Sequence, residues 1–197
     1  VEHVNYGRKQ ISFREPFTGS QTPVVLSQVV IEKEAHSFTR MRNVGMNGFE
    51  VRVTGQEANK NIGSSRVMWI AVSRGAGSYQ AQPVVAGVTP DHVTHRWRNV
   101  QPPNDGQSQY TREPVILAQM QTEDGGDSAV TRIRVPDGDN PHAQFEVHVQ
   151  EGNSRDAEVR HTHEVVGYLT LPDVSFTVID SDRDGLPDAF ELSHGLN

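Results

Sequence analysis

The sequence predicts an all-β fold of two tandem antiparallel β-sandwiches, with about six strands each, followed by a short C-terminal loop and helix. Three observations support this prediction. Short runs of apolar residues alternate with polar ones, as in strands with one face in a core and one in water. A set of these runs occurs twice in the same order. No segment before residue 187 keeps an apolar period of 3.6 residues, so helices are not expected there.

The strand patterns of the first half recur in the second half. The run Pro23-Val24-Val25-Leu26 is matched by Pro114-Val115-Ile116-Leu117. The other matched residues are Phe13 with Trp97, Arg40 and Arg42 with Arg132 and Arg134, Phe49 with Phe145, and Trp69 with Tyr168. Length differences fall in segments rich in Gly, Asn, Asp, Ser and Pro, as expected for surface loops.

This repetition predicts three regions. Residues 1–76 form the first sandwich, residues 77–174 form the second with longer loops, and residues 175–197 form the C-terminal loop and helix. Residues 74–90 join the two copies and could add a strand. The alternative is one mixed sandwich whose strands merely look alike.

Composition excludes several classes of function. The formal net charge is −7, and Lys9, Lys33 and Lys60 are the only lysines, which disfavours nucleic-acid binding. No run of 18 apolar residues is present, so no membrane insertion is expected. The chain has no cysteine, which excludes thiol chemistry and disulfides.

The core residues resemble those of a known family. The first copy is similar to the H-type lectins in the order Phe13, Pro16-Phe17, Pro23 to Val25, Gly48 to Val51 and Trp69 to Ala71. The second is similar to a bacterial extracellular branch of that fold in Phe145 to Val149, Gln150-Glu151 and His161 to Tyr168. The resemblance implies six-stranded sandwiches that often trimerise through their edges and bind N-acetylgalactosamine or related sugars.

The resemblance also points to candidate carbohydrate-binding residues. Where the family has a sugar-stacking aromatic residue and a histidine, the chain has Gln56 and Glu57 in the first copy and Gln150 and Glu151 in the second. An arginine on a neighbouring strand contacts sugar in that family, and the corresponding residues here are Arg40, Arg42, Arg132 and Arg134. The polar partners are thus present without an aromatic platform.

Ion pairing is the alternative role of these arginines. They could solvate the outer sheet face and pair with Glu50, Glu57 or Glu146, and the residue chemistry alone favours this role.

The C-terminal run from Asp180 to Glu191 fits the twelve-position calcium loop without a gap. Gly185 allows the sharp turn, and the predicted ligands are Asp180, Asp182, Asp184, Leu186 through its carbonyl, Asp188 and Glu191. The run resembles thrombospondin type-3 and dockerin-like repeats, which implies Ca²⁺ as cofactor and an extracellular or cell-surface location. An acidic disordered tail is the alternative.

His161 and His163 are the sharpest candidates for other chemistry. Spaced i and i+2 on a strand, they would share a face and could hold Zn²⁺ with Glu158 or Asp156 nearby. Two histidines are a weak metal signal, so we favour a structural role. No nucleophile elbow or phosphate loop is present, and catalysis is not expected.

These expectations combine into a secreted, bacterial carbohydrate-binding or adhesion module with a glycan or polysaccharide ligand. Two other functions fit the same residues: a non-binding spacer of a large surface protein, and a carbohydrate-binding appendage of a polysaccharide-degrading enzyme.

Overall fold

A computed structural model of the chain describes residues 2–5, 7–30, 36–59, 63–79, 81–103, 110–137 and 142–173. The regular structure in these ranges is β, apart from one turn of 3-10 helix at Glu57–Asn59. The all-β prediction is therefore confirmed. No helix among the described residues is long and apolar enough to cross a membrane.

The first six strands form what we call the first strand set. They pair into two antiparallel sheets, in the orders β1-β6-β3 and β2-β5-β4. The strands are β1 (Glu2–Val4), β2 (Lys9–Ser12), β3 (Val24–Val30), β4 (Ser37–Arg42), β5 (Gly48–Gly55) and β6 (Ser65–Val72).

Strands β8 to β13 form the second strand set and pair in the same order. Their sheets are β10-β13-β8, extended by β7, and β11-β12-β9. The strands are β7 (Gly75–Tyr79), β8 (Gln82–Val88), β9 (Arg98–Val100), β10 (Val115–Met120), β11 (Ala129–Arg134), β12 (Phe145–Glu151) and β13 (Val166–Leu171). The boundary predicted between residues 76 and 77 falls inside β7, the extra strand of the joining segment.

The register of the two sets is also the same. Arg40 lies opposite Arg52 and Arg42 opposite Glu50, just as Arg132 lies opposite His148 and Arg134 opposite Glu146. Because the side-chain period of a strand is two, matching registers place matching side chains on the same face.

One predicted match is wrong. Ile11 lies opposite Phe49 and Val100 lies opposite Phe145, so Val100 is the counterpart of Ile11. Counted from this pair, Trp97 takes the position of Arg8, while Phe13 corresponds to Pro102. Phe13 is buried but Trp97 is exposed. The aromatic identity of the two residues concealed this difference in register.

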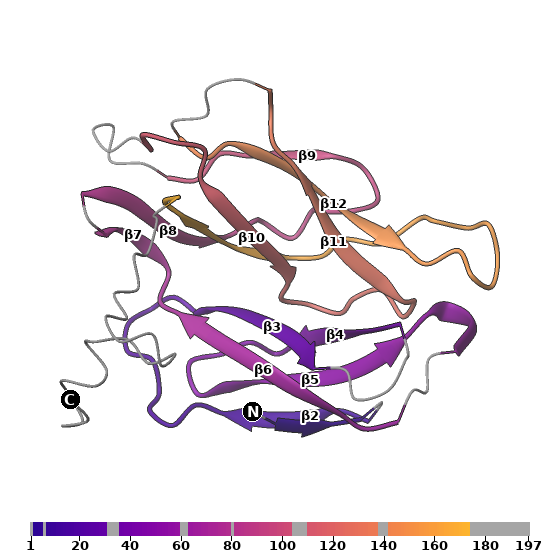
Figure 1. The fold of residues 1–197 in the computed structure, drawn as a ribbon. Helices are drawn as coiled ribbons and strands as arrows, with labels where there is room; N and C mark the ends of the chain where they lie inside the picture. Colours follow the sequence, from indigo (N-terminus) through magenta and orange to yellow (C-terminus); the bar gives the residue numbers. More distant parts are fainter. Residues whose placement is uncertain are drawn as a thin grey trace, which may run out of the picture.

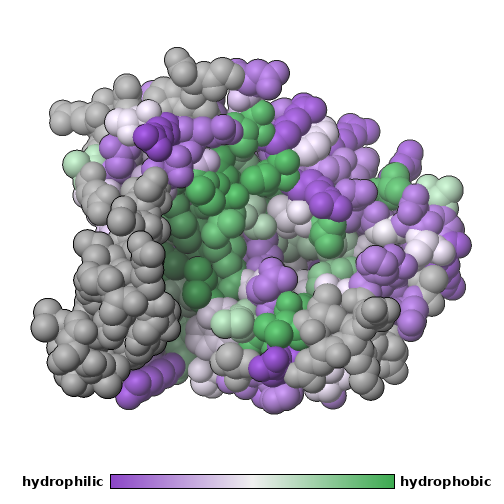
Figure 2. Space-filling view, in the orientation of Figure 1, coloured by the Kyte–Doolittle hydropathy of each residue, from purple (hydrophilic) through white to green (hydrophobic). Residues whose placement is uncertain are grey.

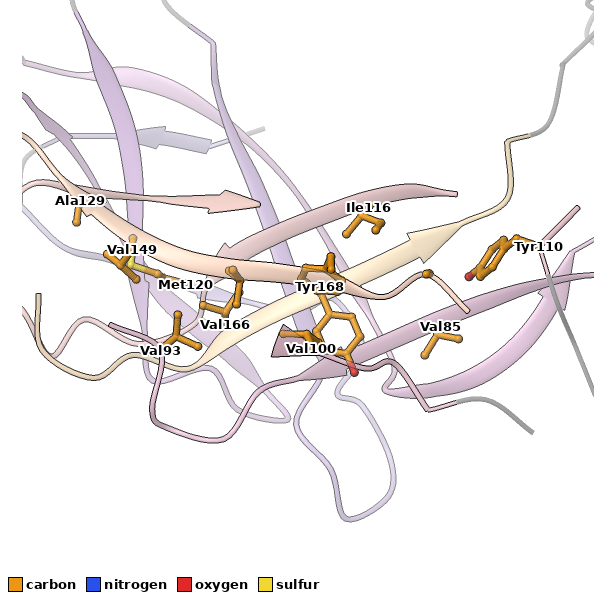
Figure 3. Close-up of a cluster of buried hydrophobic side chains, with 13 residues drawn as sticks. Val85, Val93, Val100, Tyr110, Ile116, Met120, Ala129, Val149, Val166 and Tyr168 are labelled. Atoms are coloured by element: carbon orange, nitrogen blue, oxygen red, sulfur yellow. The ribbon is translucent and has the colours of Figure 1, made fainter. Parts of the chain in front are cut away.

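Each strand set encloses its own core. In the first set Phe49 and Trp69 pack edge to face, with ring centroids 5.4 Å apart. In the second set Phe145 and Tyr168 repeat this pair at 5.5 Å, and Figure 3 shows Tyr168 within its cluster of buried side chains. Alternating residues of the strands supply both cores, so each set is sandwich-like.

The two strand sets pack against each other, as Figure 1 shows. A third apolar cluster joins Val24 of β3 to Ala86 of β8 and Leu169 of β13. The predicted third region, with its calcium loop and helix, lies outside the described residues.

Candidate functional site

A buried ion pair joins the two strand sets. Arg40 of β4 donates from Nη2 to Oε1 of Glu164 at 3.0 Å, and both side chains are 0% exposed. Arg40 also donates to the carbonyl oxygens of Gly125 and Asp127. Glu164 accepts from the Thr122 hydroxyl and from the backbone N–H groups of Asp124 and Gly125. A buried charge pair with this many hydrogen bonds fixes the relative position of the elements that carry it.

His161 lies between two carboxylates in the same cluster. Its Nδ1 is 2.5 Å from Oε1 of Glu151, and its Nε2 is 2.9 Å from Oε1 of Glu164. Gly125 leaves room for the ring, since a Cβ on Gly125 would lie 2.3 Å from Cε1 of His161. Both ring nitrogens are therefore used in hydrogen bonds.

This arrangement holds an additional proton. Neutral imidazole has one N–H, so hydrogen bonds to two carboxylates need a second proton, on the ring or on Glu151. Burial disfavours the charged ring, but its hydrogen bonds to Glu164 and Glu151 outweigh burial and raise the pKa of His161. Burial raises the pKa of Glu151, against the hydrogen bond with His161. These two directions agree with one proton shared by the pair.

Glu164 remains ionised. Burial by itself would raise its pKa, but hydrogen bonds from His161 and Thr122 and the charge of Arg40 lower the pKa of Glu164. Its negative charge is thus balanced inside the protein.

A second carboxylate bridges the two sets close to this cluster. Glu123, whose side chain is 2% exposed, pairs with Arg8 at 2.5 Å and with Arg52 of β5. Two carboxylates from the second half of the chain, Glu123 and Glu164, therefore pair with arginines of the first half.

The outer face of sheet β11-β12-β9 is open to solvent and carries an aromatic residue. Trp97 precedes β9, is 36% exposed, and packs against the ring of His148 with centroids 4.1 Å apart. The Arg134 guanidinium carbon lies 4.5 Å from the centroid of a Trp97 ring, and Arg134 also pairs with Glu146. These contacts place an aromatic ring beside planar polar groups, in the arrangement that ring stacking and bidentate hydrogen bonding require.

Two predicted carbohydrate-binding residues lie on this open face. Arg132 and Gln150 are exposed, and Nε of Arg132 donates to Oε1 of Gln150 at 2.9 Å. Arg134 on the same face contacts Trp97, which the sequence pattern matched to Phe13. Matching Val100 with Ile11 would have identified Trp97 as a surface residue. Val100 is a core residue of β9, and Trp97, three positions earlier, therefore lies on the opposite face of the sheet.

The other predicted residues are distributed differently. Arg40 and Glu151 are buried in the cluster described above, so a ligand on the surface does not reach them. Arg42 pairs with Glu50 at 2.8 Å, as the ion-pair alternative predicts. Gln56 is exposed, and Glu57 lies in the 3-10 helix with Oε2 buried.

The predicted metal ligands divide between described and undescribed residues. His161 is buried but His163 is exposed, and neither belongs to a regular strand, so the expected shared face is absent. Among the described residues no group of three or more His, Asp or Glu side chains is arranged to hold a metal ion. The six calcium ligands predicted between Asp180 and Glu191 lie outside the described part of the chain.

A groove of about 510 Å³ runs along the seam between the two strand sets. Figure 2 shows hydrophobic side chains gathered along this seam. Its lining includes Met68, Ile70 and Leu117, with Ser27 and Gln119 as polar members, and contains no titratable side chain. The groove therefore offers apolar contact without a general acid or base.

Comparisons of the chain with models of known protein families, with curated proteins and with solved structures gave no significant match.

Proposed function

We propose that the chain consists of two tandem H-type lectin-like β-sandwiches and binds carbohydrate outside the cell without changing it covalently. The observation that carries this proposal is the open face of sheet β11-β12-β9, where Trp97 lies beside Arg134 and His148. An exposed ring can cover the C–H face of a sugar, while guanidinium and amide groups pair with its hydroxyls. Arg132 and Gln150 supply such groups on the same face.

The equal strand order and register of the two sets support the tandem arrangement. The arrangement also explains why only one copy offers this face. In the first copy the corresponding surface, around Arg40 and Arg52, is covered by residues of the second. The two copies therefore differ in function although they share a fold.

A glycan array tests this proposal. The wild-type protein should bind a restricted set of glycans, and Trp97→Ala should reduce that binding at least about tenfold through loss of the platform. Tyr79→Ala, which removes another exposed aromatic residue, is the control and should bind normally. An array without any hit, or equal binding by Trp97→Ala and the wild type, would contradict the proposal.

A non-binding spacer is the second candidate. The buried Arg40–Glu164 pair and the apolar cluster around Val24 favour it, because they fix the two sets relative to each other as a rigid rod requires. An empty glycan array, together with unchanged melting of Trp97→Ala, would select the spacer. If the chain is attached to a catalytic domain, it is the carbohydrate-binding appendage of a polysaccharide-degrading enzyme and binds through the same face.

Calcium binding at Asp180 to Glu191 and an extracellular location remain part of the proposal on the strength of the loop spacing. Ca²⁺ should raise the melting temperature by binding the folded state, and Asp184→Ala should remove this effect. An identical melting temperature with Ca²⁺ and with chelator would contradict the calcium site.

A further inference from the structure

One row of three residues crosses the outer sheet face in each strand set. In the first set the row is Arg8, Arg52 and Arg40, on β5 and its two neighbours. In the second set the matching row is Trp97, His148 and Arg132, on β12 and its two neighbours. Arg8 and Trp97 each directly precede the first strand of the row.

The protein itself fills the row of the first set with carboxylates. Glu123 contacts Arg8 and Arg52, and Glu164 contacts Arg40. Both acids lie in connections between strands of the second set, Glu123 between β10 and β11 and Glu164 just before β13, and both are almost completely buried. In the first set, this row of three arginines therefore receives two negative charges side by side.

The row of the second set has no such partner among the described residues. Within the described part of the chain, Arg132 donates to the neutral amide of Gln150 and pairs with no carboxylate. Trp97 and Arg132 are exposed and His148 is half-buried. Arg134 also lies on this face, where its guanidinium contacts the Trp97 ring and pairs with Glu146. An exposed guanidinium whose side-chain partner is a neutral amide can receive a carboxylate through paired N–H groups.

We propose that the row of Trp97, His148 and Arg132 binds a saccharide that carries a carboxylate, such as a uronic acid residue. This inference rests on the proposed carbohydrate-binding function and adds the class of sugar. Arg132 receives the carboxylate as Arg40 receives Glu164, and His148 lies beside it. Trp97 occupies the position that Arg8 has in the first row. The second row therefore has an aromatic ring where the first row has a further arginine. That exchange favours a pyranose over an acidic peptide, because a peptide carboxylate gains nothing from a ring in that place.

Oligogalacturonate and its methyl ester are suitable probes, since they share sugar ring and linkage but only the first is charged. Titration calorimetry should show binding of the acid at least about tenfold tighter than the ester at low salt. The preference should decline at high salt because an exposed charge pair is screened. Oligomers of mannuronate and guluronate, with their esters, extend the test to other ring geometries.

Matched variants assign the preference to the row. Arg132→Ala should bind acid and ester equally, while Trp97→Ala should lose both. Arg42→Ala removes an exposed arginine of the first set that lies outside both rows, and should keep the preference. Circular dichroism of each variant checks that it is folded.

The outcomes separate the inference from the function on which it rests. If neutral glycans bind through Trp97 but no uronate is preferred to its ester, carbohydrate binding stands and the inference is wrong. If a polyglutamate peptide binds as tightly as the uronates and loses binding in Arg132→Ala, the ligand is an acidic peptide and the inference is again wrong. If no glycan of either kind binds, both proposals fail.

Discussion

Arg40 and Arg132 occupy the same position in β4 and β11, but only Arg40 is buried. Burial lowers the pKa of Arg40, against the charges of Glu164 and Glu123. An arginine in such a place remains charged because its partners are carboxylate and carbonyl oxygens. Arg132 retains its contact with water and contributes little to folding.

This difference predicts opposite results for one substitution at two matched positions. Arg40→Ala leaves the Glu164 charge buried without its cation and should lower the free energy of unfolding by about 3–5 kcal/mol. Arg132→Ala should change it by less than about 0.5 kcal/mol. Urea denaturation of the two variants measures both effects, and equal losses of stability would contradict the assigned burial.

The proton shared by His161 and Glu151 predicts a pH dependence of stability. The pKa of His161 is raised above its ordinary value of 6.5, so its contribution is complete below pH 6.5 and is lost as the pH rises through the folded-state pKa. The pKa of Glu164 is lowered from 4.5, so its contribution is complete above pH 4.5 and is lost on acidification. The pKa of Glu151 is raised from 4.5, so its contribution is complete below pH 4.5 and is lost as the pH rises through its folded-state pKa. The melting temperature should therefore be highest in mildly acidic solution and decline as the pH rises above 6.5.

Glu151→Gln tests which groups cause that decline. The amide oxygen can still accept from Nδ1 of His161, but it carries no charge and no titratable proton. The variant should show a shallower decline between pH 6 and pH 9 than the wild type. An unchanged slope would place the titrating group outside the His161–Glu151 pair. Arg40, Thr122 and the Gly125 N–H, which also face Glu164, do not titrate in this range.

At the scale of elements, β3 and β10 are edge strands joined by glutamine side chains instead of backbone pairing. Gln121 accepts from the Val25 N–H at 2.9 Å and donates to the Val25 carbonyl at 2.8 Å. Gln119 accepts from the Ser27 N–H and donates to the hydroxyls of Ser27 and Thr39. The open edge of β3 is thereby protected from pairing with another chain.

The repeat provides a matched pair of variants for this contact as well. Gln119→Ala leaves the Ser27 N–H without its partner, while the Ser27 and Thr39 hydroxyls keep only each other, and should cost about 1–3 kcal/mol. Gln28, which occupies the matching position in β3, is exposed, and Gln28→Ala should cost less than about 0.5 kcal/mol. Thermal melting measures both, and a larger loss in Gln28→Ala would contradict this role for Gln119.

The strands could be predicted from sequence because each copy encodes its own alternation and the repeat supplies a second example. The pairs Arg40–Arg132 and Trp69–Tyr168 have the register predicted from the sequence. The contact between the copies could not be predicted, because Glu123, Glu164 and His161 have no counterpart pattern in the first copy. Trp97 was missed because an aromatic residue in a β pattern is more often part of a core than of a surface.

At the scale of the whole molecule, the two strand sets should unfold together. The apolar cluster around Val24 and the Arg40–Glu164 pair are lost if either set unfolds alone. Scanning calorimetry should therefore show one transition whose calorimetric and van't Hoff enthalpies agree. Two separate transitions would show that the contact between the sets adds little to stability.

The same contact decides which of the two rows is open to solvent. Because the second set covers the Arg8–Arg52–Arg40 row, only the Trp97–His148–Arg132 row remains open. Duplication thus provides one copy whose row is covered by the interface and one whose row is exposed and forms the proposed binding face. The groove along the seam, lined in part by the exposed Met68, Ile70 and Leu117, adds apolar surface without titratable groups.

The indole N–H signals of the two tryptophans test this account most directly. Trp69 packs against Phe13 and Phe49 in the first core, whereas Trp97 lies on the open face. During titration of ¹⁵N-labelled protein with a bound glycan, the Trp97 signal should shift to saturation while the Trp69 signal stays in place. Saturable glycan binding that leaves the Trp97 signal unmoved would contradict the binding face.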